Sequence, residues 1–160
     1  MLVSFLESIK HVGHIYPVAL LRIYLGYHYL NLGFDHLKDE FLTQPRLAAT
    51  IVERLAQPDL PHWYTYVLQF IVVPNWQLVA YFITYCYFII GISLLIGFMV
   101  RPVSLLGVFL TVNFIYAGVE SAIISQQTFL ILFIVLFWIG AGRCLGVDYY
   151  FYKRQRGLWW

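Results

Sequence analysis

Four stretches of the chain are apolar over enough residues to cross a membrane as helices. They are residues Val12–Phe34, Trp76–Met99, Val103–Val119 and Ile123–Ala141. A membrane-spanning helix needs about 20 predominantly apolar residues. Arg101 and Pro102 interrupt the pattern between the second and third stretches, because proline and the residue before it disfavour a continuing helix. The pattern predicts an all-α membrane protein, a four-helix transmembrane bundle in a single domain over residues 1–160.

The segment between the first two predicted spans, residues 35–75, has a helical pattern of its own. Pro45 suits the first turn of a helix. Apolar residues then recur at every fourth position, at Leu47, Ile51 and Leu55. This spacing predicts an amphipathic helix on the outer side of the bundle. Residues 61–74 are apolar but too short to span, and we expect them to be interfacial or re-entrant, or to extend the second span as one helix kinked at Pro74.

Composition narrows the class of protein. Of 160 residues, 61% are hydrophobic and only 11% are charged. A soluble domain has roughly a quarter of its residues charged, so this chain has too little polar surface for a water-soluble globule. Aromatic residues make up 19% of the chain, and they favour membrane–water interfaces. An integral membrane protein fits these values.

Charged residues are distributed unequally between the two sides of the predicted bundle. With both termini in the cytoplasm, the inner side has Lys10, Arg101, Arg143, Lys153, Arg154, Arg156, Glu7 and Asp148. The outer side has Lys38, Arg46, Arg54, Asp35, Asp39, Glu40, Glu53, Asp59 and Glu120. The net charges are then +4 inside and −3 outside. Because positive segments stay in the cytoplasm, a multi-pass inner-membrane protein with cytoplasmic termini is predicted, its tail of residues 142–160 lying on the inner surface.

One basic residue, Arg22, lies inside the first predicted span. At about 100° per residue, Arg22 shares a helix face with Gly26, Tyr29, Gly33 and His36. The two glycines would let another helix approach closely, so this face is expected to point into the bundle. Arg22 is then expected roughly 16 Å from the cytoplasmic end of the span. A charge at that depth needs partners inside the protein.

The buried arginine has two interpretations. In the first, its guanidinium joins helices by donating hydrogen bonds to neutral groups at similar depth. In the second, it belongs to a site for an anionic or carbonyl-bearing ligand, such as a quinone or a lipid headgroup, since intramembrane ionisable residues are commonly functional. The candidate ligand-binding residues are Arg22, Tyr29, His36, Thr84, Tyr85, Asn113 and Gln126.

The histidines and cysteines follow no familiar metal or redox pattern. All five histidines precede the second predicted span, which argues against a haem held between two spans. Cys86 and Cys144 form no CxxC motif, and no nucleotide-binding motif is present. His36 and the acidic residues beside it are expected to form a solvated helix end rather than a metal site. We therefore do not expect the chain to be an enzyme on its own.

Three segments carry a resemblance to a known family. They read LLRIYLGYHYLNLGFDHL at residues 20–37, RPVSLLGVFLTVNF at 101–114 and GAGRCLGVDYY at 140–150. In this order they resemble the motifs of the DoxX family of four-helix membrane proteins. By that resemblance the motif residues are Arg22, Gly26, Arg101, Pro102, Gly142, Arg143 and Asp148. The sequence departs from the family at His36, where lysine is common, and in its longer outer segment.

The resemblance implies a function linked to redox chemistry, because relatives include the small subunit of a thiosulfate:quinone oxidoreductase. We expect an accessory subunit of a redox system in a bacterial inner membrane, with a polar cavity near Arg22 for a quinone. Its partners would be the lipid bilayer and a redox protein that carries the electrons. A homo-oligomer is a further alternative, and we expect no binding to nucleic acid. The alternatives are a protein that binds or transports a lipid or small solute, and a structural anchor for a partner protein.

Overall fold

The computed structural model describes residues 16–39, 41–56, 60–117, 123–143, 146–148 and 150. Regular structure within them is entirely helical, as the sequence pattern predicted. The elements are α2 (Tyr16–Lys38), α3 (Arg46–Leu55), α4 (His62–Val67), the π-helical η2 (Leu68–Val72), α5 (Trp76–Ile96), α6 (Val100–Ala117), α7 (Ile123–Ile139) and the 3-10 turn η4 (Ala141–Arg143).

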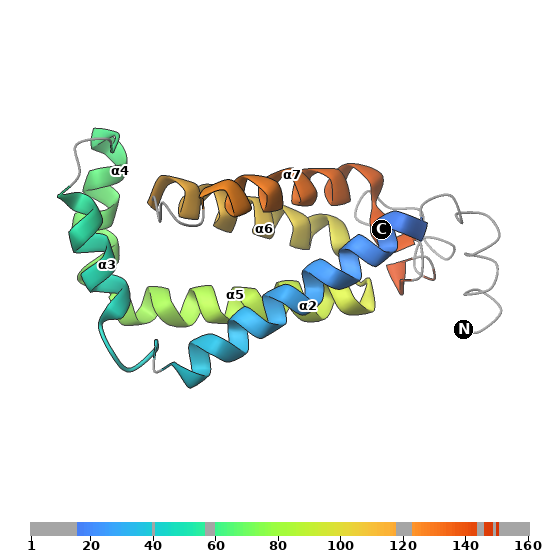
Figure 1. Ribbon diagram of the computed structural model, residues 1–160, viewed down its shortest axis with the longest axis horizontal. Helices are drawn as coiled ribbons and strands as arrows, with labels where there is room; N and C mark the ends of the chain where they lie inside the picture. The colour runs from blue at the N-terminus through green and yellow to red at the C-terminus, as the bar shows by residue number, and fades with distance from the viewer. Residues whose placement is uncertain are drawn as a thin grey trace.

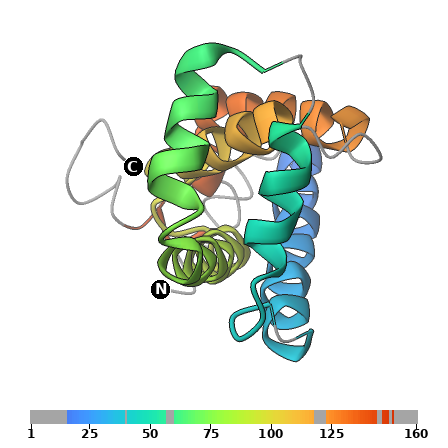
Figure 2. The same cartoon turned by 90° about the vertical axis from the view of Figure 1, so that its left-hand side faces the viewer.

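Four long helices form two layers, with a shorter helical segment across one end. Helices α2 and α5 pack against each other in one layer, and α6 packs against α7 in the other, with α5 also contacting α6. Figure 1 shows α3 and α4 lying across the end of the bundle at which α5 begins. Figure 2, which looks onto that end, shows α3 and α4 in front of the long helices.

The helices differ in how well they suit a membrane. In the described residues, α5, with 21 residues, and α6, with 18, are long and apolar enough to span. Helix α7 is apolar but has only 17 residues. Helix α2 has 23 residues, but Arg22 and its other polar residues make it the least apolar of the four. The described residues therefore contain two helices of membrane-spanning length and one shorter apolar helix, and the count of four spans stays a prediction.

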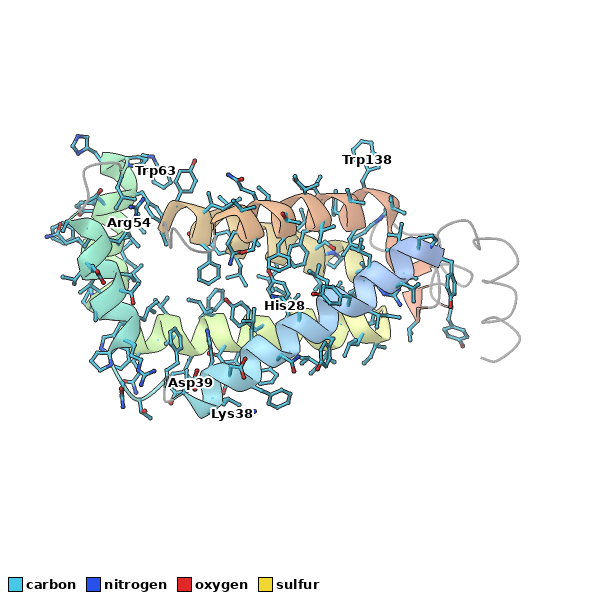
Figure 3. The ribbon with its side chains drawn as sticks, viewed as in Figure 1. His28, Lys38, Asp39, Arg54, Trp63 and Trp138 are labelled. Atoms are coloured by element: carbon cyan, nitrogen blue, oxygen red, sulfur yellow. The ribbon has the colours of Figure 1, made fainter. Side chains whose placement is uncertain are left out.

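Large apolar side chains cover the outside of the bundle. Trp138 and Ile124 of α7 are both 82% exposed, and Leu78 of α5 is 71% exposed. Figure 3 shows Trp138 pointing away from the helices, whereas His28 lies between the two layers. Such a surface is too apolar for water and suits contact with lipid tails.

The break between α5 and α6 lies before Arg101 and Pro102, so the predicted boundary was wrong. Helix α5 ends at Ile96, where Gly97 adopts a left-handed conformation with φ of 71°. Helix α6 begins at Val100 and includes Pro102. Proline is tolerated there because the first residues of a helix have no intrahelical partner for their N–H groups. The glycine, and not the proline, ends the helix.

The segment between α2 and α5 contains the predicted amphipathic helix. Helix α3 buries Ile51 against Tyr64 and Leu68 of the next helical segment. That segment, α4 with η2, is followed by a turn over residues 73–75, after which α5 runs in a different direction. Because this turn includes Pro74, residues 61–74 meet α5 at an angle, which agrees both with a capping segment and with a helix kinked at Pro74.

Candidate functional site

Arg22 is fully buried at the end of the bundle opposite to α3. Its Nη1 donates a hydrogen bond to the backbone oxygen of Ala141 at 2.7 Å. The same nitrogen lies so close to Gly97 and Gly146 that a Cβ at either glycine would fall 2.7 to 3.0 Å from it. We expected Arg22 at the depth of Thr84 in α5, but its guanidinium lies beside Gly97, just past the end of that helix. Helix α2 continues to Lys38, four residues beyond the predicted limit.

Asp148 lies at the same end of the bundle as Arg22. Its carboxylate accepts hydrogen bonds from the backbone N–H of Met99, at 2.7 Å, and of Val100, at 3.1 Å. Its own N–H donates to the oxygen of Gly97 at 3.0 Å. The carboxylate is thus the acceptor for backbone N–H groups at the start of α6. A negative charge is favourable at the N-terminus of a helix.

Residues from all three motif segments meet here. Arg22 comes from the first segment, Asp148 and Gly142 come from the third, and a Cβ on Gly142 would overlap the Asp148 carboxylate. The Arg101 guanidinium of the second segment lies against Gly140. The side chain of Arg143 is outside the described residues. Sequence reasoning missed Gly97, and its only signal was a glycine at the end of an apolar run.

Tyr29, His36 and Thr84 lie along the contact between α2 and α5. Tyr29 is buried and packs edge to face on Tyr87, with 5.4 Å between ring centroids. His36 Nδ1 lies 3.3 Å from Thr84 Oγ1. Because the single Thr84 hydroxyl proton is donated to the Ala80 oxygen at 2.9 Å, His36 Nδ1–H must be the donor of the pair.

His36 therefore differs from its prediction. We expected a solvated helix end, but its ring is half-buried and stacks on Phe41 with 4.1 Å between centroids. Asp35 and Asp39, the neighbouring acids that the structure describes, are exposed instead. Successive residues of a helix point about 100° apart, so His36 falls on the buried face while Asp35 beside it falls on the exposed one.

Two other candidates lie away from Arg22. Tyr85 is 64% exposed on the outer surface of α5 and stacks on Tyr81. Gln126 lies near the start of α7, and its buried Oε1 has no hydrogen-bond partner among the described residues. The structure does not bring either residue to the arginine.

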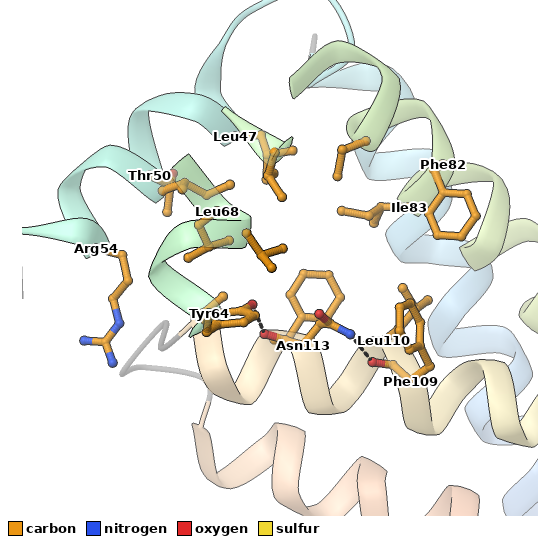
Figure 4. Close-up of a pocket in the computed structure, with 16 residues that line it drawn as sticks. Leu47, Thr50, Arg54, Tyr64, Leu68, Phe82, Ile83, Phe109, Leu110 and Asn113 are labelled. Carbon is orange, nitrogen blue, oxygen red and sulfur yellow. Dashed lines mark hydrogen bonds between the residues drawn. The ribbon is translucent and has the colours of Figure 1, made fainter. Parts of the chain in front are cut away.

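Asn113 lines a cavity of about 300 Å³ at the α3 end of the bundle. Figure 4 shows the cavity between α3 and α4 on one side and α5 and α6 on the other. Its wall is mostly apolar and includes Leu47, Leu68, Ile83 and Leu110. Sequence reasoning found the apolar face of α3 but not the space beneath it, because the cavity needs the far ends of α5 and α6.

Few polar groups line this cavity, and most of them are engaged. Tyr64 Oη donates to the backbone oxygen of Asn113 at 3.0 Å, and burial raises the pKa of this phenol, so it stays protonated. The Asn113 Nδ2 donates to the Phe109 oxygen at 2.7 Å. Thr50 Oγ1 donates to the oxygen of Arg46 at 3.0 Å. The remaining polar side chain of the wall is Arg54.

A protein-family comparison identifies the chain: the DoxX model matches residues 18–119. The chain belongs to the DoxX family. The resemblance to the family is thereby confirmed, and membership makes the chain an integral membrane protein. No curated protein and no solved structure matched it.

The DoxX match covers most of the structure described above. It includes Arg22 and every residue that lines the cavity, which all lie between Leu47 and Ala117. It ends before Gly142 and Asp148, so the third motif rests on the resemblance of its residues alone.

Proposed function

We propose that this DoxX protein is an accessory membrane protein that binds a lipophilic molecule of the quinone or lipid class in the cavity under α3. The cavity is the observation that supports the proposal. Its volume of about 300 Å³ lies at the lower end of the roughly 300–1,000 Å³ typical of ligand pockets. It suits a ring with a short tail, or a single acyl chain, better than a whole phospholipid.

The walls of the cavity also suit entry from the bilayer. Phe82 of α5 and Phe109 of α6 line it, yet these side chains are 50% and 55% exposed. They therefore reach from the cavity to the outer surface of the helices. A lipophilic molecule could move from the membrane into the protein between them without passing through water.

A cavity favours a binding protein over a purely structural anchor. Unfilled apolar space lowers stability, because the atoms that line it lack packing partners. A chain that served only as an anchor would gain by closing the gap between α3 and α5. Arg22 does not line this cavity and lies at the opposite end of the bundle, where it bonds to Ala141.

The accessory role in a redox-linked system is supported by family membership, and the chain would supply a binding site while a partner protein carries electrons.

For the membrane arrangement we keep four spans with both termini in the cytoplasm of a bacterial cell. The unequal charges support it. In that arrangement the cavity lies toward the outer side of the inner membrane.

The test is to purify the protein with its native lipids and identify bound molecules by mass spectrometry. Val79 lines the cavity, so Val79→Phe should fill part of it and lower the amount of bound quinone or single-chain lipid several-fold. Its neighbour Leu78 faces outward, so Leu78→Phe is the matched control and should leave that amount unchanged. Equal ligand content in wild type and Val79→Phe would contradict the proposal.

The identity of the bound molecule separates the alternatives. A quinone supports the redox-linked role, whereas a fatty acid or other single-chain lipid supports lipid binding or transport. A protein partner that co-purifies with no small molecule in the cavity would favour the anchor and overturn the proposed binding.

A further inference from the structure

The polar groups of the cavity differ in what they can offer a ligand. Three of them, Thr50, Tyr64 and Asn113, donate hydrogen bonds to backbone oxygens of the protein. A ligand could use the bonded protons only by replacing a bond that already exists, and none of the three groups carries a charge. Arg54 is the exception.

Arg54 is a cation at the edge of an apolar cavity. Its Nε is buried, and within the described part of the chain it has no hydrogen-bond acceptor. Leaving a buried donor of a charged group unsatisfied is costly. Figure 4 shows the side chain at the rim beside Tyr64, with its guanidinium outside the apolar centre.

We propose that Arg54 binds the ionised carboxylate of a single-chain lipid whose hydrocarbon tail fills the cavity. This inference rests on the proposed function and names the class of ligand. The planar guanidinium matches the geometry of a carboxylate. Two of its N–H groups can each donate a charge-assisted hydrogen bond to one carboxylate oxygen. The apolar walls fit the tail, and the volume of about 300 Å³ leaves room for one chain only.

The position of Arg54 on α3 supports the pairing. The helix lies across the end of the bundle, at the level where α5 begins and where a membrane surface is expected. A fatty acid in a bilayer holds its carboxylate at that surface and its tail inside. The lipid would therefore enter the cavity in the orientation that it already has in the membrane.

A pair of lipids that differ only in charge tests this proposal. Protein is reconstituted in phosphatidylcholine nanodiscs with equal amounts of oleate and oleyl alcohol, at a pH that ionises the fatty acid. The protein is then extracted, and both lipids are quantified by mass spectrometry. Wild type should retain oleate over oleyl alcohol by about tenfold, as expected for one charge-assisted hydrogen-bonded pair.

Variants of two arginines on α3 show whether position matters. Arg54→Gln should lower the ratio of oleate to oleyl alcohol to near that of empty nanodiscs while oleyl alcohol is still retained, and Arg54→Lys should keep part of the preference. Arg46→Gln is the matched control, because the Arg46 Nε already donates to Gln44 at 3.1 Å on the exposed side. It should leave the ratio unchanged.

Two results would overturn the proposal and leave ligand binding intact. One is a wild-type ratio equal to that of empty nanodiscs while both lipids are retained. The other is an equal fall in Arg54→Gln and Arg46→Gln, which would reflect the general charge of α3. If instead Val79→Phe retained as much of both lipids as wild type, the cavity would not be the site, and the proposed function would fail as well. Thermal unfolding of each variant verifies that it is folded.

Discussion

Arg22 in α2 and Ala141 in η4 are 119 positions apart, yet the arginine Nη1 donates a hydrogen bond of 2.7 Å to the alanine oxygen. The bond joins the first described helix to the segment that follows α7. Gly97, at the end of α5, packs on the same guanidinium. One buried side chain thus holds three segments together where α5 ends.

Replacing Arg22 should therefore affect stability more than ligand content. Arg22→Met leaves the Ala141 oxygen buried without this donor, at a cost of about 1–3 kcal/mol. Arg22→Lys should recover part of the loss, since an ammonium can donate but lacks the planar fork. Thermal unfolding and lipid mass spectrometry on the same preparations measure both quantities. If Arg22→Met lost its bound lipid at unchanged stability, the ligand-site interpretation of Arg22 would be correct instead.

Asp148 should be a second determinant of stability at this end. Asp148→Ala removes the acceptor of two backbone N–H groups, those of Met99 and Val100, and should lower the free energy of unfolding by about 1–3 kcal/mol. Asp148→Asn keeps one oxygen and should cost less. The control is Asp39→Ala, because Asp39 is exposed. Equal melting temperatures for the Asp148 and Asp39 variants would contradict the capping role.

Local patterns predicted the helices well, because each depends on residues a few positions apart. The spacing of Leu47, Ile51 and Leu55 identified α3, and its apolar face does pack inward at Ile51. The boundary between α5 and α6 was misplaced because Pro102 is a conspicuous helix breaker. At the first turn of a helix it breaks nothing, whereas the left-handed Gly97 ends α5.

Long-range relationships were not predictable from the same patterns. The partner of Arg22 is a backbone oxygen, and every residue has one, so no side chain in the sequence marks Ala141. The cavity is formed by α3, α4, η2, α5 and α6 together, and no single segment carries its shape. His36 was placed with its acidic neighbours because they are adjacent in sequence, but the direction of the helix face decides its burial.

The close approach of α2 and α5 gives a prediction about two glycines. A Cβ on Gly26 would lie 3.0 Å from the backbone oxygen of Gly91 and 3.0 Å from the backbone nitrogen of Leu95. A Cβ on Gly33 would meet the Phe88 ring at 3.2 Å, and that ring can rotate. Because backbone atoms cannot move aside singly, Gly26→Ala should destabilise the protein by about 1–3 kcal/mol and Gly33→Ala by less. The melting temperatures of the two variants in one detergent measure this order, and the reverse order would show that the helices separate easily at Gly26.

The orientation of the bundle can be tested with single cysteines. In a background with Cys86→Ala and Cys144→Ser, a membrane-impermeant maleimide is added to intact cells. Glu53→Cys on the exposed side of α3 should be labelled, because the acidic outer segment is predicted to face away from the cytoplasm. Gln155→Cys should react only after the membrane is permeabilised, since it lies in the basic tail. The opposite pattern would show that the bundle has the reverse orientation in the membrane. In that case α3, Arg54 and the cavity would lie on the cytoplasmic side. A lipid ligand would then have to come from the inner leaflet, so the same experiment decides which leaflet supplies the cavity.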